Sequence, residues 1–288
     1  MKLSLQSKYK LNDGSEIPVL GFGTYELEGE NAYRAVKWAL EAGYRHIDSA
    51  EWYENEQECG RAILDYCNES GVSRADIFYT TKLKHNAGIE ATRKAIDLSL
   101  ELCGLGYIDL YLIHGPWGGP EARRQAWEAC VAAQKEGKVK SIGISTFGLR
   151  HMRELFESGL PLPSVHQIDL HPFMTRTEIV EFCKDKGVVL EAWAALARTM
   201  RFEHPLIVSL SKKYEKGPAH IFLRYSLQKG FVPLVKSADR VRIVSNANVF
   251  DFELDLTELA QLDQLDESNA HQQKQKDLVT DWDPTDCP

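Results

Sequence analysis

The stretch Ile108-Asp109-Leu110-Tyr111-Leu112-Ile113 is a short, mostly apolar run that leads directly into His114. Its length and its β-branched and aromatic residues favour a buried strand. Two earlier runs have the same form. Arg45-His46-Ile47 leads into Asp48, and Asp76-Ile77-Phe78-Tyr79-Thr80-Thr81 leads into Lys82. A chemically distinctive side chain therefore follows each of three consecutive predicted strands.

Strand-like and helix-like patterns alternate along the rest of the chain. The predicted strands lie at about 19–22, 45–48, 77–81, 108–113, 140–144, 164–168, 188–193 and 231–235. The predicted helices lie at about 32–40, 54–68, 90–103, 120–136, 148–158, 176–186 and 217–228. Since no linker divides these units, the pattern favours a closed (β/α)8 TIM barrel over two Rossmann halves.

The two ends of the chain add smaller elements to the predicted barrel. Asp13-Gly14 between two β-type runs predicts a hairpin at about 8–18. The barrel itself would cover about 19–255, and a C-terminal helix and tail would follow at about 256–288. Residues 1–288 are thus interpreted as a single domain of the α/β class.

Composition limits the classes of protein to consider. The chain has 288 residues and a net charge of −8, which disfavours nucleic-acid binding through a basic surface. Its apolar runs fall short of the ~20 residues of a membrane span, and the start does not resemble a signal peptide. The six cysteines are scattered without a Cys-x-x-Cys pair, which favours free thiols and a cytoplasmic location.

Four side chains of complementary chemistry should meet at one rim of the barrel, since the carboxyl ends of parallel strands lie together. They are Asp48, Tyr53, Lys82 and His114. A phenol titrates near ~10 in water. We expect Lys82 to lower the pKa of Tyr53 and Asp48 to keep Lys82 charged, with His114 as a second donor to a substrate oxygen. This set suits protonation of a carbonyl oxygen. A nicotinamide hydride would complete the reaction, since no Gly-x-Ser-x-Gly elbow is present.

These residues lie in motifs through which residues 8–255 resemble the aldo-keto reductase superfamily. The matching stretches are Gly21-Phe22-Gly23-Thr24, Gly43-Tyr44-Arg45-His46-Ile47-Asp48-Ser49-Ala50 with Tyr53, Thr81-Lys82-Leu83, Asp109-Leu110-Tyr111-Leu112-Ile113-His114, Gly143-Ile144-Ser145, Gln167 and Val249-Phe250-Asp251-Phe252-Glu253-Leu254. The resemblance implies a barrel that reduces aldehydes and ketones with NADPH, of the alcohol dehydrogenase (NADP+) or aldehyde reductase type. Tyr53 would donate the proton, Lys82 and Asp48 would adjust the pKa of Tyr53, and His114 would orient the carbonyl. The end, Trp282-Asp283-Pro284-Thr285, resembles fungal members.

The resemblance also implies a binding site for the cofactor. Trp193 stands where a Tyr usually stacks on the nicotinamide, and two cations, Lys236 and Arg242, favour the 2′-phosphate of NADPH over NADH. Three departures, Thr146 for Asn, Ala194-Ala195 for Ser-Pro and Ser245 for Glu, imply a modestly changed cofactor affinity. The cofactor-binding residues implied are Gly23, Thr24, Ser145, Thr146, Gln167, Trp193, Leu196, Lys236, Ser237, Arg242, Ser245 and Asn246.

Tyr25, Trp52, Lys84 and His114 fall where members of the family line the substrate pocket, and Gly115 adjoins them. Larger aromatic residues are common at positions 84 and 115. We therefore expect a wide, open and polar pocket that accepts polar or bulky carbonyls, including sugar-derived ones.

Two other functions are compatible with parts of this pattern. The same fold serves as a regulatory nicotinamide-binding protein in the potassium-channel β-subunits. A metal-dependent hydrolase would use Asp48, His114 and His171, but no His-x-His strand motif supports it, and we expect no metal site. The expected partner is a small-molecule carbonyl substrate, with neither nucleic acid nor membrane, and the chain is expected to be a monomer or weak dimer.

Overall fold

The computed structural model describes residues 3–267, 285 and 287. In this part of the chain, eight parallel strands form a closed barrel in the order β10-β3-β4-β5-β6-β7-β8-β9. The predicted (β/α)8 barrel is thereby confirmed. The strands are β3 (Gly21–Gly23), β4 (His46–Asp48), β5 (Phe78–Leu83), β6 (Ile108–Ile113), β7 (Val139–Ser145), β8 (Val165–Asp169), β9 (Val189–Trp193) and β10 (Val232–Val235).

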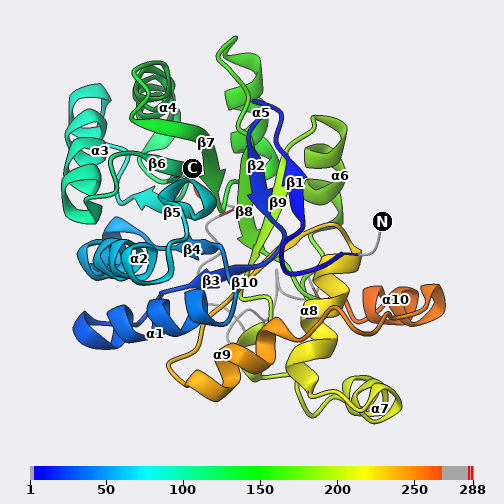
Figure 1. Ribbon diagram of the computed structural model, residues 1–288. Coiled ribbons are helices and arrows are strands. Elements are labelled where there is room, and N and C mark those ends of the chain that lie inside the picture. The colour runs from blue at the N-terminus through cyan, green and yellow to red at the C-terminus, as the bar shows by residue number, and fades with distance from the viewer. Residues whose placement is uncertain (1–2, 268–284, 286, 288) are drawn as a thin grey trace.

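Helices surround the strands (Figure 1). They are α1 (Gly29–Glu41), α2 (Glu56–Ser70), α3 (Ile89–Cys103), α4 (Gly119–Lys135), α5 (Leu149–Glu157), α6 (Thr177–Asp185), α7 (Pro205–Tyr214), α8 (Pro218–Gln228), α9 (Arg240–Ala247) and α10 (Leu256–Asp263). The sequence patterns missed α7 and α9, which are short. The start of α9 does carry a recognisable signal, because the Asp239 side chain caps it by accepting from the Arg242 backbone N–H at 2.9 Å.

The predicted hairpin closes the N-terminal end of the barrel. Strands β1 (Lys8–Lys10) and β2 (Glu16–Pro18) pair antiparallel. Leu11 and Ile17 of this hairpin are buried in one cluster with barrel residues that include Phe78 and Val165. Phe78 and Val165 begin their strands, so the apolar plug lies at the end of the barrel opposite Asp48.

The predicted C-terminal helix is α10, which lies beside α8 at the edge of the molecule (Figure 1). A capping box starts it, in which the Asp255 and Glu258 side chains accept from each other's backbone N–H. Trp282, Asp283 and Pro284, which suggested a fungal-like end, lie outside the described residues. The six cysteines form no disulfide.

Gly60 of α2 shows how closely the helices of the outer ring pack. A Cβ atom at this position would lie 1.8 Å from the carbonyl oxygen of Cys103, at the end of α3. We expect Gly60→Ala to lower the free energy of unfolding by about 1–3 kcal/mol or more, because backbone cannot yield as a side chain can. Urea denaturation measures this change. Gly217→Ala is the control, since its Cβ would meet only the His220 ring at 3.3 Å. Equal losses in the two variants would contradict the packing argument.

Candidate active site

The four predicted catalytic residues lie together at the C-terminal end of the barrel. Asp48 ends β4, Lys82 lies in β5 and His114 follows β6. Tyr53 ends the short 3-10 helix η1 (Glu51–Tyr53), which precedes α2. The parallel pairing of β4 with β5 and of β5 with β6 brings these segments side by side.

The Lys82 ammonium is the centre of this group. Its Nζ donates to Asp48 Oδ1 at 2.7 Å, to the Ser49 carbonyl at 2.7 Å and to the Tyr53 hydroxyl at 3.4 Å. Lys82 is fully buried. Burial is the largest single influence and lowers the pKa of Lys82, but the charge and hydrogen bond of Asp48, together with Tyr53 and Glu191, outweigh it. The net pKa is raised, so the amine stays charged.

The pKa of Tyr53 differs from the sequence-based expectation. Burial raises this pKa, and the lowering by Lys82, though present, does not outweigh it. The expected net decrease is therefore wrong. The physical consequence is a phenol that keeps its proton at neutral pH while an ammonium lies within reach of the phenolate that would form.

His114 lies beside the phenol, with ring centroids 5.7 Å apart in an edge-to-face arrangement. Burial, and then the Lys82 charge, hold its pKa well below the usual value, so the imidazole is neutral. Its Nδ1 is buried and has no hydrogen-bond partner among the residues that the structure describes. A neutral imidazole can donate one hydrogen bond, which fits the predicted contact with a carbonyl oxygen.

A layer of buried polar groups beneath Asp48 was not predicted. Gln167 Nε2 donates to Asp48 Oδ2 and to Glu191 Oε2, both at 2.9 Å. Glu191 Oε1 lies 3.5 Å from His46 Nε2, inside the barrel. Burial, reinforced by the charge of Asp48, raises the pKa of Glu191 to about 8, and burial lowers that of His46 to about 3. Both groups are therefore neutral at pH 7.

The raised pKa of Glu191 predicts how stability changes with pH. An unfolded Glu loses its proton near 4.5, whereas the folded one keeps it until about 8. Between these values the unfolded state binds fewer protons, so the free energy of unfolding falls as pH rises. Glu191→Gln removes this dependence, and its Tm relative to wild type should be higher at about pH 8 than at about pH 5. Thermal melts at both pH values measure it, with the exposed Glu90→Gln as control. A pH-independent difference would contradict the assignment.

Asn55 is a second residue that the sequence did not single out. It is buried, and its Nδ2 donates to the carbonyls of Thr24 and Leu27 at 2.9 and 2.8 Å. Its Oδ1 accepts from Ser49 Oγ at 2.7 Å. Asn55 therefore ties the loop after β3 to the loop that carries Tyr53.

The substrate side of Tyr53 is aromatic. Tyr25 and Trp52 are 51% and 44% exposed, and the Tyr25 ring lies 5.2 Å from that of Tyr53. The expectation of an open, polar site at Gly115 is wrong, because the indole of Trp117 fills the space that a side chain there would take. Lys84 is half-buried, and its carbonyl accepts from the Trp117 indole N–H.

The residues expected to hold the nicotinamide lie on neighbouring strands. Ser145 of β7 pairs with Gln167 of β8, and Trp193 ends β9. Trp193 is half-buried, so part of its ring is open for stacking. Thr146 has φ of 56°, a left-handed conformation that Asn adopts more easily than a β-branched residue. Thr146, which replaces the family's usual Asn, therefore has a strained backbone conformation.

The residues expected to bind the adenosine phosphate gather at the start of α9. Arg242 Nε donates to Ser237 Oγ at 3.3 Å, and Lys236 lies 3.8 Å from Glu26. Two cations beside a helix N-terminus suit a phosphate. Ser245 instead turns toward α8, where its Oγ lies 3.2 Å from His220 Nε2.

Most of the other residues predicted to bind the cofactor are buried. Thr24 is buried and its Oγ1 donates to the Asp48 carbonyl at 2.9 Å. Gly23 and Asn246 are also buried, and Leu196 packs against two apolar clusters. Trp193 is half-buried and Lys236 and Arg242 are exposed, and these residue types fit NADP(H), whereas Ser145 is buried.

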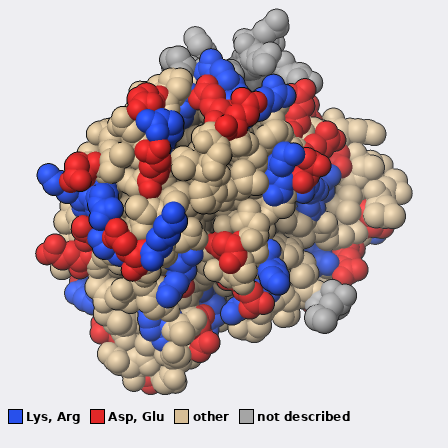
Figure 2. Space-filling model, turned by 90° about the horizontal axis from the view of Figure 1, so that it is seen from above, with Lys and Arg blue, Asp and Glu red and all other residues tan. Residues whose placement is uncertain are grey.

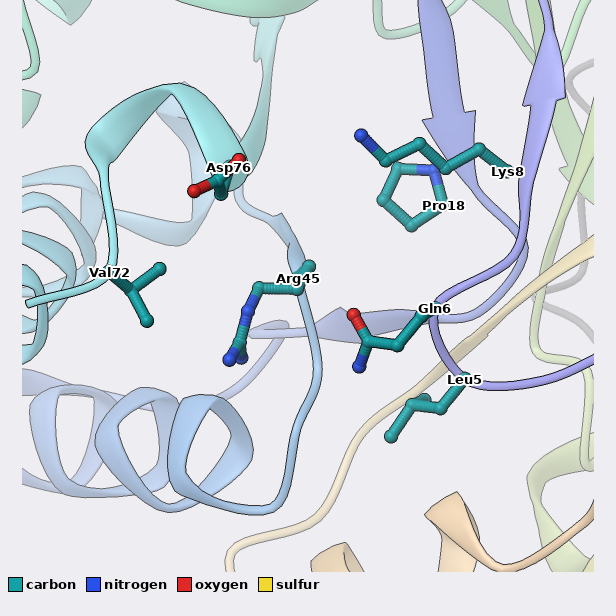
Figure 3. Close-up of a pocket in the computed structure, with 7 residues that line it drawn as sticks. All are labelled: Leu5, Gln6, Lys8, Pro18, Arg45, Val72 and Asp76. Carbon is teal, nitrogen blue, oxygen red and sulfur yellow. The ribbon is translucent and has the colours of Figure 1, made fainter. Parts of the chain in front are cut away.

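A separate hollow of about 290 Å³ lies at the opposite end of the barrel (Figure 3). Its lining comes from the N-terminal segment and from the residues that precede β4 and β5: Leu5, Gln6, Lys8, Pro18, Arg45, Val72 and Asp76. The guanidinium of Arg45 already donates to the carbonyls of Leu40 and Tyr44 and to the Tyr66 hydroxyl. None of the four catalytic candidates reaches this hollow.

Charged side chains of both signs mix on the face shown in Figure 2, and potential metal ligands do not cluster among the described residues. Figure 2 shows a face on which cationic and anionic side chains are interspersed. Within residues 3–267, 285 and 287, no three His, Cys, Asp or Glu side chains are placed to hold a metal ion. In the same residues, none of the helices has the length and apolar character needed to span a bilayer.

The model of the Aldo/keto reductase family matches residues 19–267. The chain belongs to this family. The match covers the whole barrel, including the strands that carry Asp48, Lys82 and His114.

Several relatives span nearly the full length of this aldo-keto reductase. An uncharacterized oxidoreductase of Schizosaccharomyces pombe is 41% identical over 99% of both chains. Glyoxal reductase of Bacillus subtilis is 38% identical over 92% of this chain and 95% of its own. The Bombyx mori aldo-keto reductase in complex with NADP has a TM-score of 0.90 and 30% identity, covering 99% of this chain and 98% of that one.

Proposed function

We propose that this aldo-keto reductase reduces aldehyde or ketone carbonyls to alcohols with NADPH, as an enzyme of the alcohol dehydrogenase (NADP+) or aldehyde reductase type. The observation that carries the proposal is the Lys82 ammonium, which lies within hydrogen-bond reach of both the Asp48 carboxylate and the Tyr53 hydroxyl. A neutral phenol beside a buried cation is a proton donor whose conjugate base is stabilised in advance.

Each residue then has a defined task. NADPH, when bound, supplies the hydride to the carbonyl carbon. The neutral His114 donates a hydrogen bond that orients the carbonyl oxygen, and Tyr53 transfers its proton to that oxygen as negative charge develops. Lys82 stabilises the resulting phenolate, and Asp48 holds Lys82 in place.

The cofactor preference follows from the cations at α9. Lys236 and Arg242 would pair with the 2′-phosphate that distinguishes NADPH from NADH. Ser145, Gln167 and Trp193 would hold the nicotinamide. Ser237 and Asn246 would complete the binding site for the adenosine phosphate. Thr146, Ala194-Ala195 and Ser245 would change the cofactor affinity modestly.

The setting in the cell is also part of the proposal. Free cysteines and a net charge of −8 fit a single-domain protein of the cytoplasm that acts on small molecules as a monomer or weak dimer.

The test is an assay of cofactor oxidation with the purified protein. We expect loss of NADPH absorbance that depends on glyceraldehyde or 4-nitrobenzaldehyde, and a slower loss with NADH at equal concentration. Faster turnover with NADH would overturn the cofactor assignment. Tight NADPH binding with no substrate-dependent oxidation would instead favour the regulatory function considered above.

A further inference from the structure

The Gln167 side chain bridges two opposite sides of the barrel. It projects from β8, and its Nε2 donates at 2.9 Å to Asp48 Oδ2 on β4, the strand directly opposite in the closed order. The same Nε2 donates at 2.9 Å to Oε2 of Glu191, the register partner of Gln167 on β9. An amide nitrogen carries two protons, so these two contacts use the whole donor capacity of Gln167.

The charge of Asp48 decides which way the Gln167 amide faces. Asp48 accepts from the Lys82 ammonium at 2.7 Å, and an ionised carboxylate can only accept hydrogen bonds. The amide nitrogen must therefore face Asp48 and Glu191, and the amide oxygen must point away from them. Among the described residues, none donates to that oxygen. Gln167 thus keeps one unused acceptor next to Ser145, its register partner on β7.

The carboxyl group of Glu191 does little for the fold. It is fully buried, and the bond from Gln167 is the only hydrogen bond of its side chain within residues 3–267, 285 and 287. Its second oxygen, Oε1, has no hydrogen bond, and the nearby His46 Nε2 lies 3.5 Å away. Burying a polar group that is only partly hydrogen-bonded costs free energy. The contribution of this carboxyl group is therefore its contact with Gln167.

We propose that Glu191 is a positioning residue for the cofactor: it accepts the second N–H of Gln167 and so holds the Gln167 amide oxygen toward the carboxamide of the nicotinamide. The inference rests on the proposed placement of the nicotinamide beside Ser145, Gln167 and Trp193. Without Glu191, only Asp48 would fix the amide, and one buried N–H would lack an acceptor. The amide would then turn toward another partner, and its oxygen would no longer face the carboxamide.

The first test compares two ligands that differ in the nicotinamide. The dissociation constants of NADP+ and of 2′-phospho-ADP-ribose, which lacks the nicotinamide, are measured at neutral pH by quenching of protein fluorescence. Glu191→Met removes the acceptor and keeps a side chain of similar length. We expect it to raise the Kd for NADP+ about tenfold and that for 2′-phospho-ADP-ribose by less than about twofold. Equal weakening of both ligands, or unchanged binding of NADP+, would overturn the inference.

Glu258→Met is the control for loss of a buried, hydrogen-bonded carboxyl group elsewhere. Glu258 lies on α10, where it accepts from Lys213 Nζ at 2.7 Å. The variant should lose stability and bind both ligands as the wild type does. Weakening of NADP+ binding in Glu258→Met to the level of Glu191→Met would mean that the effect comes from a general loss of stability, and would overturn the inference.

Two milder variants test the inference even if Glu191→Met does not fold. Glu191→Gln keeps a neutral acceptor at the same place, so its Kd for NADP+ should stay within about twofold of the wild type. Glu191→Asp keeps the acid but withdraws it from Gln167 by one methylene group, so its Kd should rise about threefold. The reverse order, with Asp like the wild type and Gln weaker, would show that the acid itself matters rather than an acceptor for Gln167, and would overturn the inference.

Gln167→Ala separates this inference from the proposed nicotinamide site. It should weaken NADP+ binding about tenfold, and adding Glu191→Met should change the Kd by less than about twofold, because the effect of Glu191 passes through Gln167. Additive losses would overturn the inference. Weakening in Gln167→Ala without weakening in Glu191→Met would refute the role of Glu191 alone. Unchanged binding in Gln167→Ala would refute the nicotinamide site itself, and this inference with it.

Discussion

Tyr53→Phe is expected to lower kcat for carbonyl reduction by about 10²- to 10⁴-fold, the range that a positioned general acid contributes. The phenol is the group that Lys82 contacts on the open side of the site, and its raised pKa keeps it protonated at neutral pH. Phenylalanine keeps the ring and its packing against Tyr25, so the fold and the affinity for NADPH should change little.

The measurement is the steady-state rate of NADPH oxidation, with the dissociation constant for NADPH followed by fluorescence. Tyr44→Phe is the matched control. It also removes a phenol hydroxyl, but one that donates to the Ile243 carbonyl at 3.2 Å, away from the rim. It should lose some stability and keep its kcat. Equal rates in wild type and Tyr53→Phe would refute the proton-donor assignment.

Lys82→Met is expected to have the second large effect, on both catalysis and stability. The substitution removes the cation that stabilises the phenolate, and it leaves the buried Asp48 carboxylate without its partner at 2.7 Å. Breaking a buried pair in this way costs about 3–5 kcal/mol. We therefore expect a lower free energy of unfolding together with a kcat reduced at least as much as in Tyr53→Phe.

A double variant separates the two effects of Lys82→Met. Lys82→Met with Asp48→Asn removes both charges, so much of the lost stability should return while activity does not. Urea denaturation and NADPH oxidation, measured on the same preparations, provide the comparison. Recovery of activity along with stability would mean that Lys82 serves the fold and not the reaction.

Sequence alone predicted the barrel and the meeting of Asp48, Tyr53, Lys82 and His114, because both depend on regular features. Strand ends recur at regular intervals, and parallel strands bring those ends to one rim. The net shift in the pKa of Tyr53 was not predictable in this way. It results from a balance between burial and the Lys82 charge, and burial is a property of the folded site.

The position of the Trp117 indole and the buried, protonated Glu191 were missed for a similar reason. Gly115 indicates an empty space when the sequence is considered one residue at a time, whereas the loop brings Trp117 back into that space. Glu191 lies in β9, and its two polar partners come from other strands of the barrel: Gln167 from the neighbouring β8 and His46 from β4. Both features depend on contacts between segments that no local pattern records.

The closure of the barrel has a consequence for synthesis of the protein. Gly21 of β3, the first barrel strand, pairs with Leu234 of β10, the last. While the chain grows on the ribosome, the catalytic side chains up to His114 are already made, but β3 keeps one unpaired edge until β10 emerges. Such an edge can pair with other chains. The nascent protein thus carries its acid–base residues while the barrel still has an unpaired edge, and that edge is closed only once β10 has been made.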